Sequence, residues 1–138
     1  MTTIRTRADL GLLVLRIATG LIFLMHGYQK VSMGLGNVGA GFAKMGIPMG
    51  TVMGPAIGLL ELVGGVALII GLLARVFGLL LACDMLGAFT FVHIKNGFFL
   101  PQGYEFVMIL FAASLALALA GAGDLSVDAN MHKRTAAP

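Results

Sequence analysis

Four apolar segments of about membrane-spanning length constrain the fold of this chain more than any other feature of its sequence. They cover residues 10–28, 52–73, 76–92 and 104–122. An α-helix rises 1.5 Å per residue, so about 20 apolar residues cross the ~30 Å hydrocarbon core of a bilayer. A helix in hydrocarbon also satisfies its own backbone hydrogen bonds. The sequence therefore predicts an all-α membrane protein, a bundle of four transmembrane helices.

The composition agrees with this fold class and excludes a soluble domain. Hydrophobic residues make up 59% of the chain and charged residues only 11%, whereas soluble domains carry about 25% charged residues. Glycine occurs 20 times in 138 residues, and glycine lets membrane helices approach closely. Four spans leave too few positions for a second domain, so we predict one integral membrane domain over residues 1–138, in contact with the lipid bilayer.

The distribution of charge and cysteine narrows the function classes. The net charge is +3, but the basic residues never form a run, which argues against binding to nucleic acid. A single cysteine, Cys83, excludes an internal disulfide and a Cys-x-x-Cys pair. More basic residues fall near the chain ends and the 74–75 turn than in the other two connections, so the positive-inside rule predicts both termini in the cytoplasm. The first group is Arg5, Arg7, Arg75, Lys133 and Arg134, and the second is Lys30, Lys44 and Lys95.

Two polar or glycine-rich segments lie outside the predicted spans. The connection 29–51 contains Gly34, Gly36 and Gly39 in a G-x-G-x-x-G pattern. A dinucleotide fingerprint needs a preceding strand within a βαβ unit, whereas here a membrane helix precedes the glycines. We therefore predict a flexible loop. Residues 123–138 are predicted to be a polar, partly disordered tail.

Three ionisable residues fall inside the predicted spans: Arg16, Glu61 and Asp84. Such a group is costly in hydrocarbon unless it is paired or faces a polar cavity, so we predict a buried charge cluster. Two interpretations stay open. Arg16 and Glu61 form an ion pair that only fixes the helix register, or the surplus carboxyl, desolvated beside that pair, keeps its proton at neutral pH and handles protons.

A second group of polar residues gathers near the outward ends of the first, third and fourth predicted helices. It contains His26, Lys30, His93, Lys95 and Glu105. No His-x-x-x-His or Glu-x-x-His spacing occurs, so no metal site is predicted. Imidazole and ammonium groups can hydrogen-bond a ring carbonyl while phenylalanines supply apolar walls. We therefore predict a quinone or substrate pocket, bounded by the first three helices, at Phe23, His26, Lys30 and His93.

The first two spans carry a pattern that resembles the DoxX family of small bacterial four-helix membrane proteins. The matching residues are Leu15, Arg16, Ile17, Gly20, Leu21, Ile22, Phe23, His26, Gly27, Lys30, Glu61, Gly64, Gly65 and the turn from Gly71 to Arg75. The resemblance implies a multi-pass protein of the bacterial inner membrane that serves quinone-linked oxidoreductase systems, including sulfur oxidation and oxidative-stress complexes. Arg16 and Glu61 match the family pattern, and no catalytic role is carried over to any residue.

Three functions follow as alternatives. The first is a membrane subunit of a quinone-linked or oxidative-stress-related oxidoreductase. The sequence has no flavin fingerprint, haem-ligand pair or cysteine cluster, so its electrons would come from a redox protein partner or a bound organic cofactor. The second is a small proton-coupled transporter, acting as a homo-oligomer, with Glu61 and Asp84 as its relay. The third is a scaffold that recruits soluble partners through the 29–51 loop and the basic tail.

Overall fold

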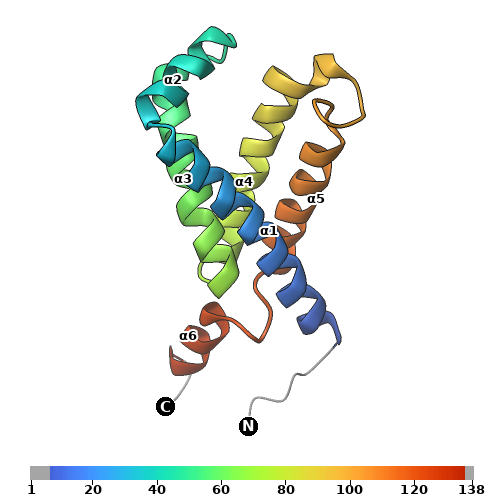
Figure 1. Ribbon diagram of the computed structural model, residues 1–138. Helices are drawn as coiled ribbons and strands as arrows, with labels where there is room; N and C mark the ends of the chain where they lie inside the picture. The colour runs from blue at the N-terminus through green and yellow to red at the C-terminus, as the bar shows by residue number, and fades with distance from the viewer. Residues whose placement is uncertain (1–6, 136–138) are drawn as a thin grey trace.

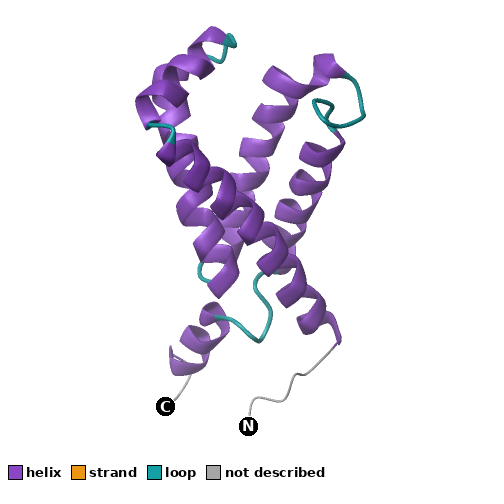
Figure 2. Cartoon of the chain, in the orientation of Figure 1, coloured by secondary structure: helices purple, strands orange, loops and turns teal. Residues whose placement is uncertain are grey.

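The protein is helical throughout the part that the computed structural model describes, residues 7–135 (Figures 1 and 2). No strand occurs within those residues. The helices are α1 (Arg7–Ser32), α2 (Leu35–Lys44), α3 (Gly50–Ile70), α4 (Ala74–Ala88), the π-helix η1 (Phe89–His93), the 3-10 helix η2 (Ile94–Asn96), α5 (Glu105–Ala120) and α6 (Val127–Thr135).

The predicted fold class is confirmed as an all-helical membrane protein. In the described part of the chain, three helices are long and apolar enough to cross a membrane: Arg7–Met33, Gly50–Ile70 and the continuous segment Ala74–Asn96. The fourth predicted segment corresponds to α5, which is apolar but has only 16 residues. At 1.5 Å per residue such a helix is about 24 Å long.

Helices α1 and α3 cross in close contact because glycines line both sides of the crossing (Figure 1). A Cβ atom built on Gly65 of α3 would lie 2.7 Å from the carbonyl oxygen of Gly20 on α1. A Cβ atom on Gly27 would collide with the backbone of Leu62. Small residues at helix contacts allow this backbone approach in membranes. The crossing therefore fixes the register of α1 against α3.

The predicted flexible loop over residues 29–51 is wrong for most of its length. Helix α1 continues to Ser32, α2 occupies residues 35–44, and α3 begins at Gly50. A Cβ atom on Gly54 would lie 2.7 Å from the Cα atom of Gly39. The glycines of the G-x-G-x-x-G pattern thus include one that lets α2 pack on α3, as in the other helix contacts of this chain.

The tail, predicted to be polar and partly disordered, contains helix α6 over residues 127–135, and residues 136–138 lie outside the described part. Helix α6 docks on the turn between α3 and α4. The carboxylate of Asp128 accepts hydrogen bonds from the backbone N–H groups of Leu73 (2.7 Å) and Ala74 (3.0 Å), which caps the start of α4. The Asp128 N–H donates to the carbonyl of Gly71 at 2.9 Å. These bonds hold the tail on the bundle.

The bundle opens at the end opposite α6, where α2 and α3 diverge from α4 and α5 (Figure 1). The buried apolar core lies between these two arms and below the opening, and it includes Phe23, Leu68, Leu81, Leu110 and Leu117. The open end holds the polar side chains considered next.

Candidate functional site

A buried ion pair joins α1 to α3. The ammonium of Lys30 lies 2.5 Å from Oε2 of Glu61, and Glu61 is 4% exposed. Gly58, one turn before Glu61, makes room for the lysine, because a Cβ atom there would lie 3.2 Å from Cβ of Lys30. The predicted pair between Arg16 and Glu61 is therefore wrong. Arg16 lies on the same helix as Lys30 but about 20 Å away, at 1.5 Å per residue.

Arg16 is buried at the other end of the bundle, where it binds backbone carbonyls. Its Nη1 atom donates to the carbonyl of Ala122 at 3.0 Å, and its Nη2 atom donates to the carbonyl of Leu125. The side chain is 2% exposed. Both carbonyls follow the end of α5, where helical partners run out. Arg16 thus ties α1 to the segment between α5 and α6.

Asp84 completes a charge cluster with the ion pair. Its side chain extends from α4 and interacts electrostatically with Glu61 and Lys30. Its Oδ2 atom is buried and has no hydrogen-bond partner among residues 7–135. The structure therefore brings together two of the three predicted cluster residues, Glu61 and Asp84, and adds Lys30. Arg16 is not part of this cluster.

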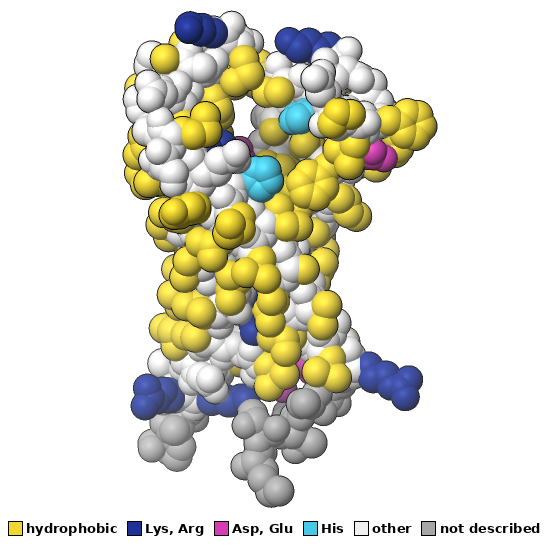
Figure 3. Space-filling model, in the orientation of Figure 1, with side chains coloured by type: hydrophobic (Ala, Val, Ile, Leu, Met, Phe, Trp, Pro, Cys, Tyr) yellow, Lys and Arg dark blue, Asp and Glu magenta, His cyan; other side chains and the backbone are white. Residues whose placement is uncertain are grey.

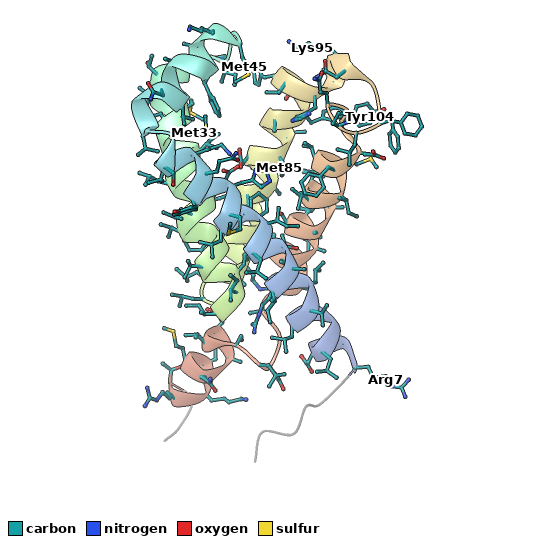
Figure 4. All side chains as sticks on the ribbon, viewed as in Figure 1. Arg7, Met33, Met45, Met85, Lys95 and Tyr104 are labelled. Carbon is teal, nitrogen blue, oxygen red and sulfur yellow. The ribbon has the colours of Figure 1, made fainter. Side chains whose placement is uncertain are left out.

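All four predicted pocket residues line one cavity of about 270 Å³, which we call the Lys30 cavity. Phe23, His26 and Lys30 come from α1 and His93 from η1, and Glu61 joins them from α3. Figure 3 shows a hollow between the two arms with two histidine side chains beside it. The remaining lining residues are Met85, which is labelled in Figure 4, Ala88, Leu100, Pro101, Gly103, Phe106, Val107 and Leu110.

The boundary predicted for this pocket needs correction, because the first three predicted spans do not enclose it alone. Residues from α5 and the preceding loop form one wall. The predicted spans did not indicate this wall, because part of it comes from the loop 97–104, which lies outside the spans and folds back on itself. Two backbone bonds hold the loop in place: Tyr104 N–H to Gly97 O (3.0 Å) and Glu105 N–H to Phe98 O (3.0 Å).

A hydrogen bond fixes the orientation of the His93 ring at the end of η1. Its Nδ1 atom lies 2.9 Å from the carbonyl oxygen of Gln102. A carbonyl only accepts, so Nδ1 carries the proton and Nε2 of the neutral ring is an acceptor. His93 is the last residue of the π-helix η1, and π-helical turns often occur at functional sites. His93 can thus accept a hydrogen bond from a ligand hydroxyl, while Lys30 can donate to a ligand carbonyl.

No metal-ligating group forms in the part of the chain that the structure describes. Within it, no three His, Cys, Asp or Glu side chains gather closely enough to hold an ion. Glu105, which the sequence placed near the histidines, accepts a hydrogen bond from the N–H of Leu100 at 2.6 Å instead. His26 packs near Phe106, with a ring distance of 6.5 Å. The polar side chains that line the Lys30 cavity can form hydrogen bonds and exchange protons.

Comparison with known proteins adds a family match. The family profile described as DoxX matches residues 11–94, a range that contains the Lys30, Glu61, Asp84 and His93 positions. The chain is 34% identical over 125 residues to "Putative oxidoreductase CatD" of Bacillus subtilis, covering 91% of this chain and 90% of that protein.

Two further relatives are membrane proteins by name. "Uncharacterized membrane protein Rv3486" of Mycobacterium tuberculosis is 30% identical over 139 residues, covering 92% of this chain and 85% of that protein. "Inner membrane protein YqjF" of Escherichia coli is 31% identical over 132 residues, covering 91% and 95% respectively. No solved structure matches the chain.

Proposed function

This chain belongs to the DoxX family, and from that premise we propose that it is the membrane subunit of a quinone-linked oxidoreductase system. The Lys30 cavity carries the proposal. It places an ammonium, a carboxyl and two imidazoles against apolar walls within the helices of a membrane protein. The relative named as a putative oxidoreductase supports a redox role.

We further propose four membrane spans, with α5 as the fourth, and both chain ends in the cytoplasm. Lys and Arg side chains gather at the end that holds α6, and others lie at the open end (Figure 3). Arg7 lies at the α6 end and Lys95 at the open end (Figure 4), while Lys133 and Arg134 belong to α6 itself. By the positive-inside rule the α6 end faces the cytoplasm. The Escherichia coli relative supports an inner-membrane location. The Lys30 cavity then lies toward the outer surface.

A quinone ring suits this cavity in size and polarity. The volume of about 270 Å³ is close to the lower end of the ~300–1,000 Å³ typical of small-molecule sites, so the ring enters while its apolar chain stays in the lipid. Lys30 donates to one ring oxygen, and His93 faces the second as a proton-exchanging group. Phe23 and Phe106 supply flat apolar walls.

The reaction in this proposal is reduction of the quinone to the quinol. Two electrons come from a redox protein partner, and two protons add, one to each ring oxygen. His93 and the Lys30–Glu61 pair are the groups that we assign to proton delivery, because they are titratable groups lining the cavity. The reverse reaction uses His93 Nε2 as the acceptor of a quinol hydroxyl proton.

The double variant Lys30→Met/Glu61→Gln is expected to weaken binding of a short-chain ubiquinone at least about tenfold, which corresponds to ~1.4 kcal/mol. One charged hydrogen bond to the ring oxygen is worth about that much. Changing both residues removes the two charges of the ion pair together, so neither partner of the pair is left unpaired. The measurement is isothermal titration calorimetry on the purified full-length protein in mild detergent.

The matched control is Lys95→Met, which removes an exposed lysine outside the cavity lining. Its quinone affinity is expected to equal that of the unmodified protein. Equal affinity in the double variant would contradict the quinone site.

We propose proton-coupled transport, by a homo-oligomer, as the second candidate function, because Glu61 of α3 and Asp84 of α4 are buried and interact with each other. Proteoliposomes that contain this chain alone are then expected to dissipate an imposed pH gradient, and Glu61→Gln vesicles are expected to hold it. A pH-sensitive dye inside the vesicles measures both. Gradient retention by the unmodified protein would count against transport. A scaffold role has less support, since the 29–51 segment and α6 both pack on the bundle.

A further inference from the structure

A second cavity lies on the other side of the charge cluster, between α2, α3 and α4. Its volume is about 310 Å³, and its walls are almost entirely apolar, with Phe42, Ile57 and Phe91 among them. Among residues 7–135, Asp84 is the one charged residue in its lining. Within the same range, Ala88 is the one lining residue that it shares with the Lys30 cavity. We call it the Asp84 cavity.

Within the described residues, the charge cluster contains two carboxyl groups, Glu61 and Asp84, but one ammonium. A side-chain hydrogen bond links Asp84 to Glu61, so the charges balance only while one of these carboxyls keeps a proton. Lys30 supplies one ammonium, and this ammonium is held by Glu61 at 2.5 Å. Asp84 makes no salt bridge in residues 7–135, although it is 8% exposed and its Oδ2 atom is buried without a hydrogen-bond donor. Arg16 is engaged at the far end of the bundle. A buried carboxylate in a membrane protein needs a compensating partner.

We propose that the Asp84 cavity binds a lipophilic amine, whose ammonium pairs with Asp84 and whose apolar body packs between α2, α3 and α4. The site lacks a positive charge and N–H donors for the carboxylate, and an ammonium supplies both. The rings of Phe42 and Phe91 suit the apolar and cationic parts of such a molecule. A hydrocarbon chain from a lipid would fill the volume but leave the carboxylate without a donor.

The test compares 3-phenylpropylamine with its neutral counterpart 3-phenyl-1-propanol, by calorimetry on the full chain in detergent. We expect the unmodified protein to bind the amine at least about tenfold more tightly than the alcohol, as one charged contact provides. Asp84→Asn is expected to abolish this preference. The control Cys83→Ala changes an uncharged residue of the same lining and is expected to keep it.

Gly87→Leu provides a second variant that leaves the charges intact. Gly87 lines the Asp84 cavity, and a Cβ atom built there meets nothing within 4 Å. A leucine side chain can therefore extend into the cavity without a backbone collision, and it is expected to block the amine. Binding of short-chain ubiquinone in the Lys30 cavity is expected to be unchanged in this variant, which separates the two sites.

Three results would overturn the proposal. Equal affinity for the amine and the alcohol in the unmodified protein would mean that a proton shared by Glu61 and Asp84 already balances the charge. Undiminished amine binding in Asp84→Asn would show that Asp84 is not the counter-ion of the amine. If Asp84→Asn does not fold, undiminished amine binding in Gly87→Leu would show that the amine binds elsewhere.

Discussion

Gly65→Leu is expected to abolish assembly of the folded bundle. A Cβ atom at this position would collide with the backbone of Leu24 and lie 2.7 Å from the carbonyl oxygen of Gly20. Overpacking against side chains costs ~1–3 kcal/mol, but here the colliding atoms are backbone and only a shift of α1 relieves the contact. That shift also separates Lys30 from Glu61. Size-exclusion chromatography of a fluorescent fusion is expected to show loss of the monodisperse peak.

The matched control for this prediction is Gly11→Leu on α1. A Cβ atom on Gly11 meets nothing within 4 Å, and leucine is a better helix former than glycine. The control is expected to elute and melt like the unmodified protein. A Gly65→Leu protein that behaves like the Gly11→Leu control would show that α1 and α3 do not pack through these glycines.

Arg16→Ala is expected to destabilise the protein by ~3 kcal/mol or more, with little effect on quinone affinity. The substitution removes two hydrogen bonds from a charged group, each worth ~1.5–3 kcal/mol, and leaves the carbonyls of Ala122 and Leu125 without their donor. A cavity adds to the cost. Thermal unfolding followed by size-exclusion chromatography measures the stability, and calorimetry on the folded protein at low temperature measures quinone binding.

Arg75→Ala is the control, because Arg75 lies at the same end and donates to the carbonyl of Leu119 at 2.6 Å but is exposed. Exposed charged contacts are worth ~1 kcal/mol or less, so its melting temperature is expected to fall much less. Loss of quinone binding in folded Arg16→Ala would contradict the separation between Arg16 and the Lys30 cavity.

The partner of Glu61 shows where sequence reasoning stops. Arg16, Gly20, Gly27 and Lys30 share one face of α1 by their spacing, so helical periodicity ranks neither cation above the other as the partner. The close contacts of Gly20 and Gly27 with α3 set the register, and that register places Lys30 beside Glu61. Arg16 then meets backbone carbonyls, which have no sequence signature.

The structure places the four residues of the predicted pocket in one cavity, but the walls of that cavity differ from the predicted ones. Phe23, His26, Lys30 and His93 line one cavity, because α1 and η1 both border it at the open end of the bundle. The wall from α5 depends on the loop before it. Backbone hydrogen bonds from Tyr104 and Glu105 to residues 97 and 98 hold this loop, and no sequence pattern indicates them. For a related reason α2 was missed: ten residues rich in glycine have low intrinsic helix propensity, and packing on α3 stabilises them.

The membrane environment, the all-helical fold class and the identity of the buried charged residues follow from the sequence alone. Long apolar segments form helices in hydrocarbon, and an ionisable residue inside such a segment needs a partner or a polar cavity. Both effects depend on the composition of one segment. Which charges meet, how α2 and α6 dock on the bundle, and which cavity Asp84 lines become known from the packed helices. Those outcomes depend on the register between helices, which is set by backbone contacts at glycines and not by any single segment.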